Sequence, residues 1–292
     1  MKLITLPRIV GIILIAIAFL THYARQGTIQ AVLLGIAALV LLCTPRKSAE
    51  KNWKQFLASL KLNKEFGILL LIDALFWTLL AILTAILTVV LRDVVNQIKI
   101  AAPTTGIAMN VIGAYNDILD AAFTKGIVAF VVFWLALIAV YALSHGMLWL
   151  TLHGKKLETK FFLRFFALNL VWCTLWVAAT VFLMSALMQP YGGLSFLVML
   201  PLYAHLTTIM HSTYAQTHSA RTSVGAAFAY GLGRLGSWAN PYCYLLIDYV
   251  VLSQIMRALP PGKLALGVTF VLFFLFMAWY RTLFKNVLRS LQ

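Results

Sequence analysis

Apolar residues come in long blocks along this chain, separated by short polar stretches. The clearest block covers residues 66–91 and contains a single charged side chain, Asp73. At about 1.5 Å of rise per residue, a helix of this length is longer than the roughly 30 Å hydrocarbon layer of a bilayer. The pattern predicts a tilted membrane-spanning helix with a carboxylate inside it.

The same pattern recurs and predicts an all-α polytopic integral membrane protein with about eight membrane-embedded helices. The blocks are residues 9–23, 29–43, 66–91, 126–152, 165–189, 194–214, 241–256 and 264–284. The first two are short, so a re-entrant hairpin is an alternative to two full spans. We expect a single membrane domain over residues 1–292. Its parts are an N-terminal hairpin (1–43), a basic surface helix (44–65) and three further helical hairpins (66–292).

Two polar stretches predict amphipathic surface helices. Residues 44–65 combine basic side chains with apolar ones at helical spacing, which is typical of a helix lying among lipid headgroups. Its lysines are expected to contact anionic lipid on the cytoplasmic face, with docking of a protein partner as the alternative: Lys47, Lys51, Lys54, Lys61 and Lys64. Residues 92–124 are broken at 103–106 and predict a second surface helix, capped near Thr104 or Thr105.

Prolines add two local expectations. Pro201 lies inside an apolar block, where it removes one backbone hydrogen bond and is expected to kink the helix. Asn240 and Pro241 together are typical of a helix start, with Asn240 as the N-cap and Pro241 as the first helical residue.

Composition and charge agree with a membrane location. Hydrophobic residues make up 62% of the chain and charged residues only 11%, whereas a soluble domain carries about a quarter charged residues. The net charge of +15 is distributed between the apolar blocks, so it indicates topology rather than nucleic-acid binding. Of the 23 basic residues, 17 fall on one side of the alternating blocks. The positive-inside rule therefore predicts a multi-pass protein of the cell membrane with both ends in the cytoplasm.

Five polar side chains inside apolar blocks are candidates for an intramembrane site: Asp73, His145, Asn169, His205 and Asp248. All but His205 fall at a similar expected depth, in the cytoplasmic third of the bilayer. The sequence Leu-Leu-Ile-Asp occurs at 70–73 and again at 245–248, which suggests related hairpin units, although so short a repeat also arises by chance in a chain rich in leucine and isoleucine.

Buried carboxylates in membranes are usually functional, and His145 is a partner that can titrate near neutral pH. The alternative is that these side chains only form hydrogen bonds between helices and fix their packing. For Asn169 and His205 that packing role is the favoured interpretation.

The remaining sequence motifs give weaker indications of function. Residues 231–236 match GxGxxG, but no strand precedes them, so close helix packing or a flexible elbow is expected instead of dinucleotide binding. The three cysteines show no ligand spacing, and no metal or cofactor is expected. With no enzyme signature, the favoured hypothesis is transport of a small solute or an ion through a polar site in the cytoplasmic half of the helices. The alternative is a non-catalytic membrane scaffold or assembly subunit that binds lipid or protein partners.

Overall fold

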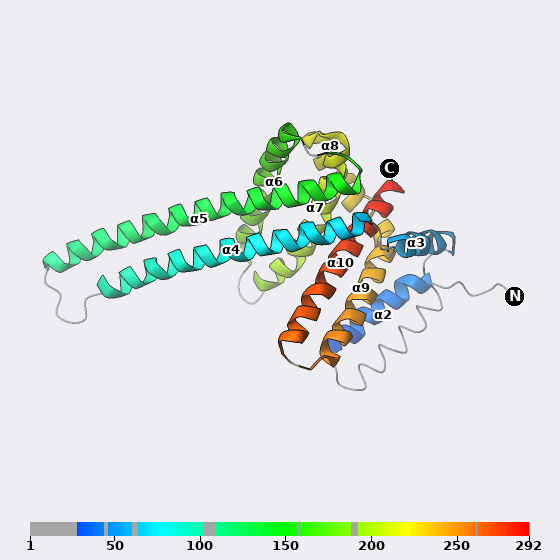
Figure 1. Cartoon of the computed structure of the whole chain (residues 1–292), viewed down its shortest axis with the longest axis horizontal. Helices are drawn as coiled ribbons and strands as arrows, with labels where there is room; N and C mark the ends of the chain where they lie inside the picture. The colour runs from blue at the N-terminus through cyan, green and yellow to red at the C-terminus, as the bar shows by residue number, and fades with distance from the viewer. Residues whose placement is uncertain are drawn as a thin grey trace. The chain divides into compact units, whose positions relative to one another are not determined.

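A computed structural model describes residues 28–43, 46–59, 64–101, 109–156, 158–187, 192–260 and 262–291, and every regular element in these ranges is a helix. In chain order they are α2 (Thr28–Cys43), α3 (Arg46–Ser59), α4 (Lys64–Ala101), α5 (Met109–Leu152), α6 (Thr159–Ala186), α7 (Gly192–Thr217), α8 (Ala220–Ala226), the π-helix η1 (Ala227–Leu232), α9 (Leu235–Ala258) and α10 (Lys263–Arg289) (Figure 1). The predicted all-α class is confirmed. The expected first block, 9–23, lies outside the described residues.

Four of these helices, α4, α5, α6 and α10, are long and apolar enough to cross a membrane. Only 6% to 17% of the residues in their most apolar windows are buried inside the protein. Their apolar side chains therefore face outward, where lipid replaces water as the surrounding medium. These four helices are candidate membrane spans by their length and composition, and the expected count of eight spans is not supported.

Three other apolar blocks form α2, α7 and α9, which are not among these candidate spans. Helix α2 has 16 residues, which at about 1.5 Å per residue is shorter than the hydrocarbon layer. Helices α7 and α9 each contain an internal proline, Pro201 and Pro241, together with buried polar side chains. An apolar block in the sequence therefore does not by itself make a span.

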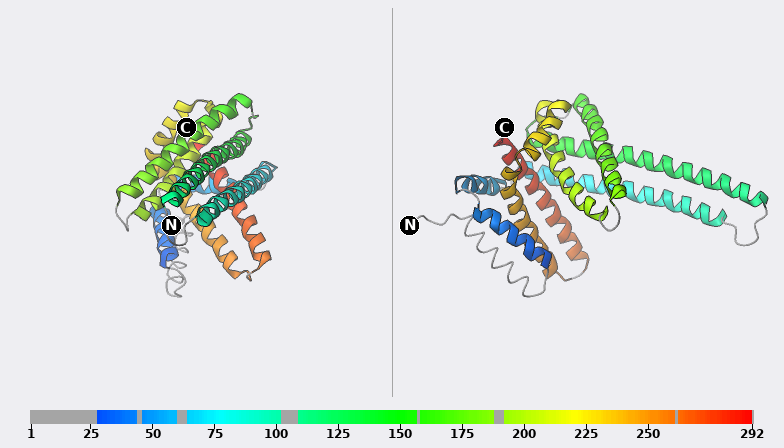
Figure 2. Two further views of the ribbon diagram at one scale, coloured as in Figure 1. Left: turned by 90° about the vertical axis from the view of Figure 1, so that its left-hand side faces the viewer. Right: turned by 180° about the vertical axis from the view of Figure 1, so that it is seen from behind.

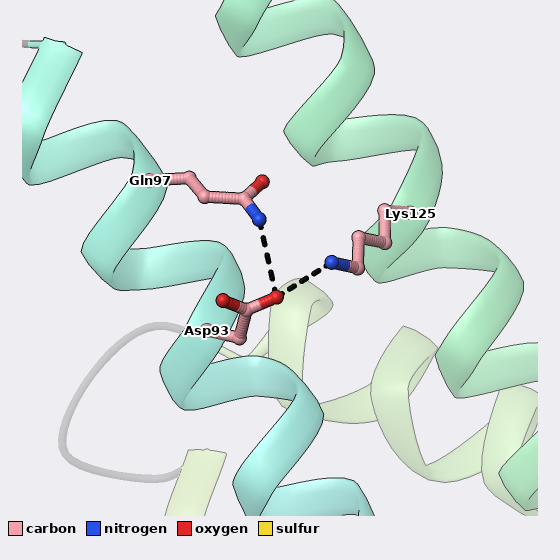
Figure 3. Close-up of polar contacts among 3 residues, drawn as sticks. All are labelled: Asp93, Gln97 and Lys125. Atoms are coloured by element: carbon pink, nitrogen blue, oxygen red, sulfur yellow. Dashed lines mark hydrogen bonds and ion pairs between the residues drawn. The ribbon is translucent and has the colours of Figure 1, made fainter.

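The expected second surface helix is wrong. Residues 92–101 continue α4 without a break, and residues 109–125 form the first turns of α5, while Thr104 and Thr105 lie outside the described residues. The two helices lie side by side as a long antiparallel pair (Figures 1 and 2). Lys125 Nζ lies 2.6 Å from Asp93 Oδ2, and Gln97 donates to the same oxygen (Figure 3). Val94 of α4 and Ala122 of α5 are buried between the two helices.

The predicted helix start at Asn240 is also wrong. Helix α9 begins at Leu235, with Arg234 as its N-cap residue, and Pro241 lies inside the helix. Both Asn240 and Pro241 are buried. Pro201 lies inside α7, as expected.

The chain divides into two compact units. The first comprises residues up to 70, 149–156 and 183–292, and the second comprises residues 71–148 and 157–182. In the first unit α9 packs against α2 and α10, α7 packs against α8 and η1, and α3 packs on α9 and α10. Its core contains large side chains with almost no exposed surface: Tyr214, Trp238, Tyr244 and Phe284. The second unit consists of the paired α4 and α5 with α6.

The continuation of α4 and α5 past their apolar blocks predicts which positions meet water. In a variant without Cys43, Cys173 and Cys243, we expect Asp117→Cys to react with a water-soluble maleimide in proteoliposomes. Val131→Cys is the matched control, because both positions are exposed on α5 but Val131 lies within the apolar block. Equal labelling of the two positions, or protection of position 117, would contradict a hairpin that leaves the hydrocarbon layer.

Candidate functional site

Asp73 is buried on α4, with 1% of its surface exposed. Phe76 follows it by one turn, and its ring meets His145 of α5 edge-on, with ring centroids 5.7 Å apart. Tyr141, one turn before His145, lies against the same two rings at 6.1 Å from Phe76 and 4.1 Å from His145. Asp73 and His145 therefore lie within about one helical turn of a shared aromatic contact.

Asn169 of α6 is fully buried, and its Nδ2 donates to the carbonyl of Phe165 at 2.8 Å. The ring of Phe165 packs close to Gly146 of α5, where an added Cβ would lie 3.3 Å from ring atoms of Phe161 and Phe165. The absence of a side chain at Gly146 lets α6 approach α5 beside His145. The second unit thus places three of the five candidates, Asp73, His145 and Asn169, on its three helices.

His205 of α7 is the centre of the first unit's polar core. Its Nε2 lies 3.3 Å from the carbonyl oxygen of Gly231, and its Nδ1 lies 2.6 Å from the hydroxyl of Tyr242. Because a carbonyl only accepts, Nε2 carries the proton, and Nδ1 of the neutral ring accepts from Tyr242. The rings of Trp238 and Phe284 lie 5.1 and 5.9 Å away. This environment holds His205 firmly in one orientation.

The π-helix η1 explains why His205 finds a free carbonyl. In η1 the hydrogen bonds skip one residue further than in an α-helix, as in the bond from Gly233 N to Phe228 O. Trp238 Nε1 donates to the carbonyl of Tyr230 at 2.8 Å, next to the Gly231 carbonyl that His205 contacts. Two buried side chains therefore stabilise two consecutive carbonyls of the widened turn. The sequence indicated only a glycine-rich segment at residues 231–236, without the π-helix or the two side chains that bind its carbonyls.

Asp248 of α9 is half-buried in the first unit, and its Oδ2 is buried without a hydrogen-bond partner among the described residues. The hydroxyl of Tyr244, one turn earlier on α9, is in the same state. The Tyr244 ring packs on Trp53 and Phe56 of α3, with centroids 5.5 and 5.0 Å away. Buried polar atoms without a protein partner are places where water or an ion is expected.

The five candidates do not form one cluster within either unit. Asp73, His145 and Asn169 belong to the second unit, and His205 and Asp248 belong to the first. A common site for the two aspartates, and the hairpin repeat behind it, stay predictions. Within the part of the chain that the structure describes, no group of three His, Cys, Asp or Glu side chains is placed to hold a metal ion.

The first unit has a basic groove, of which the sequence predicted only the lysines of α3. Its lining residues come from α3 and α10: Glu50, Lys51, Lys54, Gln55, Ala58, Asn286 and Arg289. The groove has a volume of about 610 Å³, and Gln55 Nε2 donates to the carbonyl of Asn286 at its base. Lys64 is exposed at the start of α4, whereas the Lys47 side chain and Lys61 lie outside the described residues. Residues of α10, more than 200 positions away from α3, complete the groove.

His153 lies just past the end of α5, beside α7. Its Nε2 lies 3.0 Å from the hydroxyl of Ser212 and 3.5 Å from the side-chain nitrogen of Gln216. Burial, together with the charges of Lys285, Arg289 and Lys155, lowers the pKa of His153 to about 4. The ring is therefore neutral at physiological pH. It accepts hydrogen bonds through Nε2, because the amide nitrogen of Gln216 can only donate.

No known protein family, curated protein or solved structure matches this chain. The function therefore has to be argued from the geometry of these residues alone.

Gly231 gives a direct test of the π-helical core. A Cβ at this position would lie 2.5 Å from Leu206 Cδ2 and 3.3 Å from His205 Nε2. We expect Gly231→Ala to destabilise the protein by about 1–3 kcal/mol, which is typical of overpacking in a filled core. The measurement is thermal or chemical unfolding in detergent, followed by tryptophan fluorescence.

Gly225→Ala is the matched control, because a Cβ at Gly225 meets no atom within 4 Å. We expect Gly225→Ala to be neutral or to stabilise α8 by up to about 1 kcal/mol. Equal stability of the two variants would show that the contact between α7 and η1 is not tightly packed.

Proposed function

We propose that this chain is a multi-pass protein of the cell membrane that transports a small solute or an ion through a polar site around Asp73. The observation that carries the proposal is the burial of this carboxylate, with 1% of its surface exposed, within one of the most apolar helices of the chain. Ionisable groups at such positions are costly, and they usually mark an ion or proton pathway.

The neighbours of Asp73 support a site that can exchange protons. His145, which contacts the aromatic ring one turn from Asp73, is the side chain type whose charge changes most readily near neutral pH. Asp248 Oδ2 is buried and has no hydrogen-bond partner among the described residues, which supports a second position where a cation or a proton can bind. A carboxylate offers only acceptors unless it is protonated, so the Asp248 position favours a bound proton or cation, and burial in an apolar helix favours the same chemistry at Asp73.

The distribution of basic residues supports an orientation. The four long apolar helices have basic side chains near one set of ends: Lys64, Lys155, Lys160, Arg164, Lys285 and Arg289. We assign this side, with both chain ends, to the cytoplasm. In this arrangement the expected block at 9–23 and the helices α2, α7 and α9 complete a set of about eight membrane-embedded helices, in which α2 is short and α7 and α9 each contain a proline. The site then lies in the cytoplasmic half, because Asp73 is near the Lys64 end of α4.

The test is flux in proteoliposomes. We expect the wild-type protein to accelerate proton, sodium or potassium flux under an imposed potential, and Asp73→Asn to abolish that flux, because asparagine keeps the shape but cannot exchange a proton. Asp93→Asn is the control, since Asp93 is exposed at the other end of α4. Retained flux in Asp73→Asn, or a wild-type rate no higher than that of protein-free liposomes, would contradict the proposal.

A second candidate function, a non-catalytic scaffold that holds anionic lipid, is favoured by the groove between α3 and α10. Lys51, Lys54 and Arg289 line it around a single acidic side chain, Glu50. Helix α3 is held against the protein by Trp53 and Phe56, which contact Tyr244 of α9. Arginine and lysine in such a groove match the phosphate of an anionic headgroup.

This candidate predicts a charge-specific loss of lipid binding. Each basic residue near an anionic surface contributes about 1 kcal/mol. We therefore expect the double variant Lys54→Gln/Arg289→Gln to bind short-chain phosphatidylglycerol roughly 30-fold more weakly, measured by calorimetry on the purified protein. Lys156→Gln, which removes an exposed charge outside the groove, should bind like wild type. Equal affinity for phosphatidylcholine would contradict headgroup recognition.

A further inference from the structure

The end of the α4–α5 pair formed by residues 92–101 and 109–125 has the properties of a protein interface rather than of a lipid-facing surface. Residues 92–101 of α4 and 109–125 of α5 carry charged and amide side chains, so we expect them to lie outside the hydrocarbon layer. Asp93 and Lys125 fasten the two helices to each other at the start of this segment (Figure 3). Buried Val94 and Ala122 form the seam between them.

Large apolar side chains nevertheless remain exposed in this polar segment. Phe123 is 70% exposed, Val95 is 46% exposed and Ile118 is 40% exposed. Phe123 lines a groove between the two helices, together with one charged residue, Asp120, and apolar neighbours such as Leu91, Val94, Ile98, Leu119 and Ile127. Apolar surface that meets neither lipid nor the rest of its own unit is typical of a protein-binding surface.

This segment carries basic residues on one helix and acidic residues on the other, so two copies of it have complementary charges. In this segment α4 carries the basic residues Arg92 and Lys99, and α5 carries the acidic residues Asp117 and Asp120. All four side chains are exposed. The contact between Asp93 and Lys125 sets the antiparallel register, and at about 1.5 Å per residue it places Lys99 level with residues near 119. Among the described residues, the structure gives no ion pair to Lys99, Asp117 or Asp120.

We propose that this surface binds a second copy of the chain, through a two-fold axis along the membrane normal. In such a dimer the four helices alternate in direction, so that α4 of one copy lies beside α5 of the other at the same height. Lys99 then meets Asp117 and Asp120 of the second copy, and the contact occurs twice because the interface is isologous. Phe123 of each copy fills the apolar groove of the other. The dimer needs only that this end of the hairpin leaves the hydrocarbon layer, and it does not depend on transport at Asp73.

The test is a charge exchange between two differently labelled populations of the full-length protein, reconstituted together and followed by energy transfer at a series of protein-to-lipid ratios. Lys99→Glu in one population and Asp117→Lys/Asp120→Lys in the other each place like charges opposite one another in a homodimer. We expect each variant alone to dimerise about tenfold more weakly, or worse. Mixing the two variants should restore association, because both contacts of the mixed dimer again join opposite charges.

Phe123 provides the apolar arm of the test. Phe123→Ala should weaken dimerisation about tenfold or more, as loss of a central aromatic anchor does. Phe182→Ala is the matched control, because Phe182 is also 70% exposed but lies in the apolar part of α6. Monodisperse elution and an unchanged helical signal establish that each variant is folded.

Three results on the proposed interface itself would overturn the proposal, and a fourth comes from a control variant. They are a wild-type protein that stays monomeric at all ratios, a mixture of the charge variants that associates no better than either alone, and an equal effect of Phe123→Ala and Phe182→Ala. Lys156→Glu, a charge reversal away from the hairpin, should leave dimerisation unchanged, and loss of the dimer in that variant would also contradict it.

Discussion

Backbone N–H and C=O groups inside a hydrocarbon layer have no water to bond, so each must find its partner within the protein. The long helices α4, α5, α6 and α10 meet this constraint with unbroken helical ladders and leave their side chains free to face lipid. Where the ladder is irregular, as in η1, side chains provide hydrogen-bond partners for the backbone carbonyls. His205 contacts the carbonyl of Gly231, and Trp238 donates to that of Tyr230. The polar core of the first unit follows from the broken regularity of its backbone.

The same constraint separates two kinds of buried polar side chain. Asn169 donates to the carbonyl of Phe165, four residues earlier in its own helix, at 2.8 Å. Such side chains satisfy themselves locally and imply no ligand. A carboxylate cannot do this, because without a proton it has only acceptors. Asp248 Oδ2 is buried without a hydrogen-bond partner among the described residues, so a proton or a cation is expected there, and Asp73 is a carboxylate buried in an apolar helix.

Much of the helical content could be predicted from the sequence, because the apolar blocks are long and their period is regular. The span at 66–91 and the separate basic helix α3 are examples. The helix interior at Pro241 could not be predicted, since Asn followed by Pro is equally typical of a helix start, and burial against neighbouring helices decided between them. The widening of η1 depends on side chains of α7 and α9 that lie far away in the sequence. The basic groove likewise needs Arg289 of α10 beside α3.

The error over residues 92–124 shows what a local pattern leaves open. An amphipathic stripe next to a membrane span can lie on headgroups or pair with another helix, and the stripe is the same in both cases. Length decides here. Helices α4 and α5 have 38 and 44 residues, or about 57 and 66 Å. Fitting 66 Å into a layer of about 30 Å would need a tilt of more than about 60°, beyond the usual range of 0–40°. It would also draw Asp93 and Lys125 into hydrocarbon. We therefore infer that the paired helices leave the layer together, with Val94 and Ala122 buried between them.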